Sequence, residues 1–195
     1  MTGNLGTFDV HAGTKIAEIL AAFESSDKDL LLVDECSVVT QPHLELLTDY
    51  PRTVTTALVA KAKGGLTRVS QGRITGASSS FHEVGYGNHT FLGIIRLSQT
   101  QRVHILEVLH KVKDTKHAGN AIDLVLVALV RAALVVAPAE VAGAPYIRST
   151  DSAEREAVKR EIAGLNDARL RLKLANRAND GFFSVFFLTA IWFAP

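Results

Sequence analysis

The feature that most constrains the fold is a short apolar run that ends in two acids. Residues 30–33 are Leu-Leu-Leu-Val, and Asp34 and Glu35 follow directly. An unbroken apolar run of this length is typical of a strand buried on both faces, as in a parallel sheet covered by helices. Ligands of open α/β sheets collect at the carboxyl ends of strands, so the two acids are well placed for a divalent cation such as Mg²⁺. The simpler alternative is a pair of solvated loop carboxylates or helix caps.

The segments on either side of this run alternate between strand and helix patterns, which predicts an α/β fold. Helical spacing, Pro and Gly positions and runs of β-branched residues give the boundaries. In chain order we expect a helix over 14–25, a helix from Pro42 to Tyr50, a strand over 53–61, a hairpin of 66–70 and 73–76, a strand over 90–97, a helix capped by Ser98 and Gln101, an apolar helix from Asn120 to Val130, a strand over 134–137, a loop over 138–145, and a long polar helix from Asp151 to about Ala178.

Composition excludes several classes of protein. The chain has 195 residues, enough for one domain with a short appendage. Its 21 basic and 20 acidic residues leave a net charge of +1, which argues against a dedicated nucleic-acid binder. A single cysteine rules out an internal disulfide and any multi-thiolate metal site, and it suits the cytoplasm. Residues 1–5 lack the basic start and apolar run of a secretory signal, so we expect none.

Three familiar kinds of site find no support in the sequence. No two of the seven histidines have the i,i+4 spacing with which one helix face binds zinc. The glycine clusters at 3–6, 64–65 and 85–87 lack the Lys-Ser/Thr pair of a phosphate-binding loop. Nothing in the sequence around Cys36, which follows two carboxylates, marks it as a nucleophile.

The C-terminal residues have an unusual aromatic content. Five of the nine phenylalanines and the only tryptophan lie within residues 182–195, and basic residues alternate with leucines just upstream. The tract is too short to span a bilayer as a helix, which takes about 20 residues. Cations followed by aromatic residues favour a segment at a membrane surface. The alternative is a C-terminal helix that buries these rings against the domain.

Residues 8–137 resemble the cytidylyltransferase and guanylyltransferase group of nucleotidyltransferases. The resemblance is carried by the segment 31–35, by Val38-Val39-Thr40 and by Pro42 before a leucine-rich helix. The hairpin around Gln71-Gly72 and the strand centred on Gly93 resemble the substrate-side sheet of that group. The resemblance implies a three-layer Rossmann-like core of the GT-A-like type, shortened at its N-terminus.

The same resemblance implies roles for five residues. In this group of enzymes a strand delivers an acidic residue to Mg²⁺, a place that either Asp34 or Glu35 would take here. Asp123 would be a second metal ligand by analogy, although a carboxylate in the first turn of a helix is more often explained by the helix dipole. Arg68 or Arg73 would contact a phosphorylated substrate.

The region around residues 163–184 resembles the joining helix of certain actinobacterial two-part proteins. In those, a nucleotidyltransferase-like cytosolic domain precedes a membrane-embedded CDP-alcohol phosphotransferase, whose signature is Asp-Gly-x2-Ala-Arg with further aspartates. Asp180-Gly181 begins in the same way, but Val185 stands in the place of the arginine. We therefore predict no phosphotransferase residue in this chain. The expected organisation is a nucleotidyltransferase-like domain over 1–148, a connecting helix over 149–180 and an aromatic, membrane-proximal tail over 181–195.

One departure from the nucleotidyltransferase pattern bears on activity. Active members open with a glycine-rich, arginine-bearing loop around the triphosphate, and nothing of that kind precedes the helix at Ile16. Without such a loop, both nucleotide binding and transition-state charge stabilisation are impaired.

Three functions stay open at this stage. The first is a non-catalytic module, or pseudoenzyme, that supports a CDP-alcohol phosphotransferase of phospholipid synthesis by binding substrate or partner. The second is an active Mg²⁺-dependent cytidylyltransferase that makes a CDP-alcohol from CTP and a phosphorylated alcohol. The third is a structural or oligomerisation domain without a ligand, whose interface is the helix of residues 151–178. A homodimer is the assembly expected of it. The expected ligand is CTP or a CDP-alcohol, the expected surface is the inner face of the cell membrane, and nucleic acid is not expected.

Overall fold

The computed structural model describes residues 2–4, 8–11, 15–38, 41–78, 87–115, 120–141, 148 and 151–160. The chain divides into two compact units, Met1–Arg155 and Glu156–Pro195. The named helices and strands all belong to the first unit. They are β1 (Thr2–Asn4), β2 (Phe8–His11), α1 (Ile16–Ser25), β3 (Asp29–Val33), α2 (Gln41–Asp49), β4 (Thr55–Lys61), β5 (Thr67–Ser70), β6 (Arg73–Ala77), β7 (His89–Leu97), the 3-10 turn η1 (Gln99–Gln101), α3 (Arg102–Val112), α4 (Ala121–Arg131) and β8 (Val136–Glu140).

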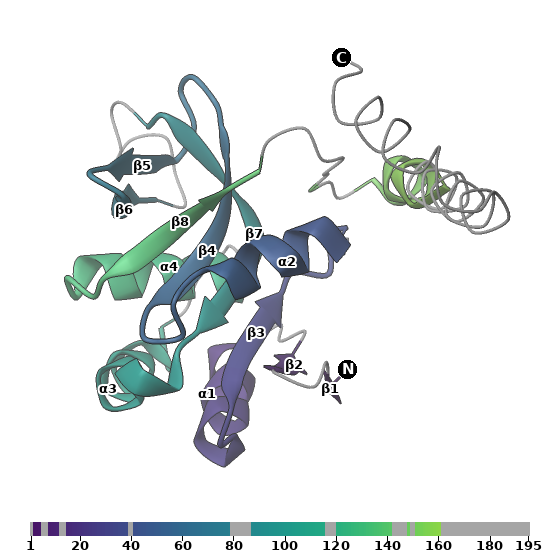
Figure 1. Ribbon diagram of the computed structural model, residues 1–195. Coiled ribbons are helices and arrows are strands. Elements are labelled where there is room, and N and C mark those ends of the chain that lie inside the picture. The colour runs from purple at the N-terminus through teal and green to yellow at the C-terminus, as the bar shows by residue number, and fades with distance from the viewer. Residues whose placement is uncertain are drawn as a thin grey trace, which may run out of the picture. The chain divides into compact units, whose positions relative to one another are not determined.

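The strands form one mixed sheet. Its main order is β1-β2-β3-β7-β4-β8, and the β5–β6 hairpin is attached to β7 through β5. β3 runs parallel to β2, and β8 runs parallel to β4. β7 runs antiparallel to both of its neighbours, β3 and β4, and so lies between the two parallel pairs. In Figure 1 the hairpin lies beside the upper ends of β4 and β7.

Helices cover the sheet on both faces, which gives three layers (Figure 1). On one face α1, α3 and α4 contact one another and enclose the larger hydrophobic core. On the other face α2 contacts β4 and β8 over a smaller core. Side chains of β3 alternate between the cores, with Leu30 and Leu32 in the larger and Leu31 in the smaller. This alternation confirms the prediction that the apolar run forms a strand buried on both faces.

A buried arginine fixes the connection between α2 and β4 to the middle of the sheet. Arg96 of β7 is fully buried. Its guanidinium donates to the backbone oxygens of Leu47, Pro51 and Val54 at 2.6, 2.7 and 3.0 Å, and Nε lies 3.8 Å from Asp29 Oδ2. Burial lowers the pKa of Arg96, while the charge of Asp29 raises it in part. The carbonyl oxygen of Leu47 in the last turn of α2 thereby gains the partner that a helix end otherwise lacks, and the segment after the helix is bound to the same guanidinium.

Most of the predicted elements are confirmed, and two details are wrong. Pro138 lies inside β8, opposite Ala57 of β4, and does not begin a loop. A proline is tolerated there because β8 is the last strand of the sheet. The capping box is half formed: Ser98 accepts from the backbone N–H of Thr100, but the Gln101 side chain accepts from that of Thr55 in β4. A contact between distant segments has replaced the local one.

The two ends of the chain are described in part. The first parallel strand, β2, is short but present, and four residues separate it from α1. A helix covers residues 152–160, and Asp151 Oδ1 accepts from the backbone N–H of Ala153 at 2.7 Å, as expected of its cap. The predicted continuation to Ala178 and the aromatic tail over 181–195 lie outside the described residues. Among the described residues, no helix has the length and apolar character that crossing a membrane requires.

Candidate functional site

Asp34 leaves the carboxyl end of β3 and points into the molecule. Its side chain is 2% exposed, and its backbone N–H donates to the carbonyl oxygen of Gly93 in the adjacent β7. Oδ1 accepts from the backbone N–H of Cys36 at 3.1 Å and from Asn120 Nδ2 at 2.7 Å. The turn after β3 therefore folds back onto the carboxylate, which is the local hydrogen bonding typical of aspartate.

Asp123 approaches Asp34 from the other side of the cluster. It lies in the first turn of α4, whose N-cap is Asn120, and its side chain is 26% exposed. Asn120 Oδ1 accepts from the backbone N–H of Ile122, while its amide nitrogen binds Asp34. One asparagine thus caps the helix and joins it to the end of β3. The structure brings together Asp34 and Asp123, two of the three predicted metal ligands.

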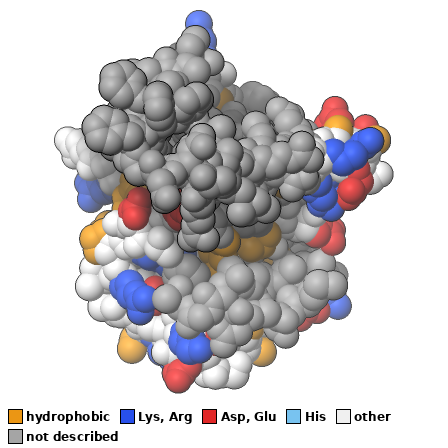
Figure 2. Space-filling view, turned by 45° about the vertical axis from the view of Figure 1, so that its right-hand side comes forward, with side chains coloured by type: hydrophobic (Ala, Val, Ile, Leu, Met, Phe, Trp, Pro, Cys, Tyr) orange, Lys and Arg blue, Asp and Glu red, His pale blue; other side chains and the backbone are white. Residues whose placement is uncertain are grey.

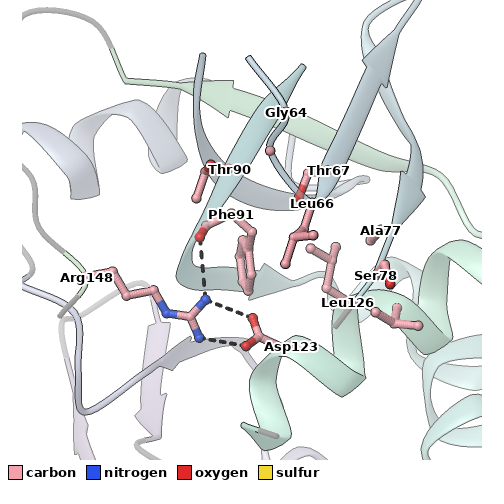
Figure 3. Close-up of a pocket in the computed structure, with 12 residues that line it drawn as sticks. Gly64, Leu66, Thr67, Ala77, Ser78, Thr90, Phe91, Asp123, Leu126 and Arg148 are labelled. Carbon is pink, nitrogen blue, oxygen red and sulfur yellow. Dashed lines mark hydrogen bonds and ion pairs between the residues drawn. The ribbon is translucent and has the colours of Figure 1, made fainter. Parts of the chain in front are cut away.

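Arg148 lies between these two carboxylates. Its Nε donates to Asp34 Oδ2 at 2.6 Å, and Nη2 lies 2.6 Å from the same oxygen. Nη1 and Nη2 donate to the two oxygens of Asp123, each at 2.9 Å (Figure 3). Burial by itself lowers the pKa of Arg148, but the hydrogen bonds and charges of Asp123 and Asp34 outweigh it and raise this pKa above its ordinary value. We call Asp34, Asn120, Asp123 and Arg148 the Arg148 cluster.

Phe91 of β7 also holds the guanidinium in place. The guanidinium lies 5.5 Å from the centre of the Phe91 ring, a cation–π distance, and Nη1 is 3.5 Å from the Phe91 carbonyl oxygen. Residue 148 also forms an isolated antiparallel bridge with Ser37, whose hydroxyl donates to Leu92 O. Arg148 is therefore held by backbone pairing and by its side chain.

The Arg148 cluster does not fit a divalent metal as it is arranged. A carboxylate has about four acceptor positions. At Asp34, two hydrogen bonds reach Oδ1 and two guanidinium nitrogens lie 2.6 Å from Oδ2. Asp34 consequently has no lone pair directed at a free position. In the described part of the chain, moreover, no three His, Cys, Asp or Glu side chains are grouped as metal ligands.

The other predicted site residues lie outside the cluster. Glu35 is exposed in the turn that follows Asp34. Arg68 and Arg73 are exposed on the β5–β6 hairpin, and neither lines the cavity beside the cluster. The structure thus separates Glu35, Arg68 and Arg73 from the two converging aspartates, and their predicted roles in binding metal or substrate stay predictions.

A cavity of about 270 Å³ opens beside the Arg148 cluster. Asp123 and Arg148 form its charged side, the hairpin and the preceding turn form another, and β7 and α4 complete it (Figure 3). Its lining residues are Gly64, Gly65, Leu66, Thr67, Ala77, Ser78, Thr90, Phe91, Asp123, Leu126, Val127 and Arg148. The walls are mainly apolar with a few hydroxyl groups, and this is the usual make-up of a small-molecule site.

Charged side chains of both signs are mixed on the surface. On the face shown in Figure 2, the described Lys and Arg side chains stand close to described Asp and Glu side chains and form no broad patch of one sign. The described part of this face therefore carries no charged patch that would mark a binding surface.

Arg148 is the site residue that sequence reasoning missed. It is separated from Asp34 by 114 residues and belongs to no recognisable motif. One signal was present, because Arg148 is the sole charged residue between Glu140 and Asp151. An isolated charge within an otherwise uncharged stretch is a reason to look for a buried partner.

The comparisons with known proteins identify the fold. No family model matches the chain, and no curated protein matches it. The solved structure of the CTP:phosphocholine cytidylyltransferase from Streptococcus pneumoniae has a TM-score of 0.52 at 9% identity, over 76% of this chain and 64% of that one. The UTP-bound UGPase from Acinetobacter baumannii has a TM-score of 0.52 at 11% identity, over 82% of this chain and 61% of that one.

A further similar structure, the inositol-1-phosphate CTP transferase from T. maritima, has a TM-score of 0.49 at 14% identity, over 75% of this chain and 62% of that one. The chain spans less than two thirds of the length of each of these three proteins. At such low identity the likeness concerns the fold alone. The domain has a nucleotidyltransferase-like, Rossmann-like α/β fold, as the sequence predicts.

Proposed function

We propose that this chain is a non-catalytic nucleotidyltransferase-like module that acts with a CDP-alcohol phosphotransferase of phospholipid synthesis. The proposal combines the nucleotidyltransferase-like fold with the resemblance of residues 163–184 to a joining helix. The observation that carries the non-catalytic part is the Arg148 guanidinium, which pairs with both Asp34 and Asp123. In an active enzyme of this fold, acidic side chains at this end of the sheet would have to bind Mg²⁺.

The short connection after β2 supports the same conclusion. Four residues join β2 to α1, and one of them is a glycine. A loop that surrounds a triphosphate needs several backbone N–H donors and a cation around the β- and γ-phosphates. Lys15 is the one cation in this connection, and it directly precedes the helix. The chain therefore has few groups there to stabilise the charge of the transition state.

The second candidate is an active cytidylyltransferase that makes a CDP-alcohol from CTP and a phosphorylated alcohol. One observation favours it: Asp34 and Asp123 converge beside a cavity that borders the hairpin. This function would require Arg148 to leave both carboxylates before Mg²⁺ and the nucleotide bind, and Arg68 or Arg73 would contact the phosphorylated substrate.

Nucleotide binding and pyrophosphate release separate the two candidates. In the presence of Mg²⁺ and any of a panel of phosphorylated alcohols, we expect the chain to release no pyrophosphate from CTP. We also expect isothermal titration calorimetry to detect no Mg²⁺-dependent binding of CTP. Pyrophosphate release by the wild type that Asp34→Ala abolishes would overturn the non-catalytic proposal. The association with a phosphotransferase is tested separately, by co-purification of the full chain with that enzyme in detergent. A chain that lacks residues 149–195 serves as the control and should not co-purify.

A further inference from the structure

The groups of the Arg148 cluster satisfy one another. Each nitrogen of the guanidinium has an oxygen partner: Nε has Asp34, Nη1 has Asp123 and the Phe91 carbonyl, and Nη2 has both carboxylates. An arginine has five N–H donors and no acceptor, so few of these donors are left for a phosphate. Asp34, in turn, has no acceptor position left for a metal.

The charges of the cluster explain why a cation is needed at this place. Asp34 is 2% exposed, and a buried carboxylate is costly unless a cation or several donors compensate it. Asn120 and the Cys36 N–H donate to Oδ1, but they carry no charge. Arg148 supplies a permanent positive charge, since a guanidinium is not deprotonated in proteins. The pair of carboxylates with one guanidinium has a net charge of −1.

The backbone around the cluster is shaped to admit the guanidinium. Gly93 has φ +75°, and a Cβ on it would lie 2.8 Å from Arg148 Nε and 2.7 Å from Asp34 Cβ. A side chain at this position would therefore displace the arginine or the aspartate. Phe91 supports the guanidinium from its own strand. The contact is consequently a built feature of β3, β7 and α4, not an incidental surface ion pair.

We propose that Arg148 is a resident cation that takes the place of a divalent metal between Asp34 and Asp123 and makes this end of the domain independent of metal ions. The inference deepens the proposed function and rests on it, because the expectation of a metal at this place comes from the nucleotidyltransferase-like character proposed there. It predicts that the wild-type chain keeps the same stability with a divalent metal and with EDTA. It also predicts that removal of the guanidinium uncovers two carboxylates that bind a divalent cation.

The test measures the binding of Mn²⁺ to the full chain. Electron paramagnetic resonance of the free Mn²⁺ reports how much of the ion is bound. The variants are Arg148→Met, which removes the charge at similar length, and the double variant Arg148→Met with Asp34→Asn. Arg52→Met is the matched control, because it removes one positive charge from an exposed position. We expect Arg148→Met to bind Mn²⁺ about tenfold or more tightly than the wild type, and we expect neither the double variant nor Arg52→Met to share this gain.

A thermal readout accompanies the binding experiment. Arg148→Met leaves a buried carboxylate without its counter-ion, so its Tm should fall, and Mn²⁺ or Mg²⁺ should recover part of the loss. The Tm of the wild type should not respond to either ion. A folded Arg148→Met chain whose Mn²⁺ affinity equals that of the wild type would overturn the proposal.

A second measurement covers the case in which Arg148→Met does not fold. Mn²⁺ is then titrated into the wild type and into Asp34→Asn. Wild-type binding of Mn²⁺ that Asp34→Asn abolishes would overturn the proposal. Absence of such binding supports it. Failure of this inference can be told apart from failure of the proposed function. The inference is tested by Mn²⁺ binding without nucleotide, and the proposed function is tested by pyrophosphate release.

Discussion

Gly93 is the residue on which the approach of Arg148 to Asp34 depends. Its φ of +75° lies in the left-handed region that side chains with a Cβ rarely adopt, and its missing side chain leaves space that three neighbours use. A Cβ would stand 2.5 Å from Ser37 Oγ, in addition to its clashes with Asp34 and Arg148. The conformational and the steric reason for glycine coincide at this position.

The two reasons can be separated by a pair of substitutions. Gly72 has a similar φ of +70°, but nothing lies within 4 Å of the place that a Cβ would take there. Gly72→Ala should therefore lower the free energy of unfolding by about 1–2 kcal/mol, the cost of the left-handed backbone alone. Gly93→Ala should lose about 1–3 kcal/mol more, because of overpacking. Urea denaturation measures both values, and equal losses would show that Gly93 has only a conformational role.

Single residues also show where sequence reasoning about the site succeeds and where it stops. Asp34 was predicted as a site residue because it ends a buried strand, and Asp123 was predicted by analogy with the nucleotidyltransferases that the sequence resembles. Arg148 has no such pattern around it. Its role exists only because β3, β7 and α4 converge, and no spacing along the chain encodes that convergence.

At the level of elements, α2 covers one face of the sheet with a buried histidine. His43 is 1% exposed, and neither ring nitrogen forms a hydrogen bond among the described residues. Burial lowers the pKa of His43. The folded chain therefore resists protonation of His43, whereas the unfolded chain accepts a proton below about pH 6.5.

This difference predicts a pH dependence of stability that belongs to α2. The free energy of unfolding should be fully retained above about pH 6.5 and should fall as the pH decreases from there through the lower pKa of the folded state. His43→Leu should lose less stability than the wild type between about pH 7.5 and about pH 5.5 in urea denaturation. The exposed His104→Leu is the control and should keep the wild-type dependence. Identical pH dependence in His43→Leu and wild type would refute the assignment.

The elements themselves were largely predictable, because burial on one or both faces leaves a pattern in the sequence. The apolar run of β3 and the apolar face of α1 are examples. Two details were not predictable for a common reason. The strand through Pro138 depends on β8 being at the edge of the sheet, and the side chain of Gln101 depends on Thr55 being nearby. Both are set by neighbours from other parts of the chain.

For the whole molecule, the aromatic tail of residues 181–195 is predicted to contact a membrane surface, and a deletion tests this prediction. We expect a chain that lacks residues 181–195 to be more soluble and to lose flotation with anionic vesicles, since the tail contains five phenylalanines and the tryptophan. A full-length chain with Phe182, Phe183, Phe186 and Phe187 changed to Ser is the matched variant and should behave in the same way. Unchanged flotation after the deletion would contradict the prediction.

The position of Arg148 also has a mechanical consequence. Only Ser149 and Thr150 separate it from Asp151, which caps the helix of residues 152–160. A pull applied at Asp151 would reach Arg148, where the backbone bridge to Ser37 and the side-chain pairs with Asp34 and Asp123 would carry it. The load is thus divided between the end of a central strand and a packed helix.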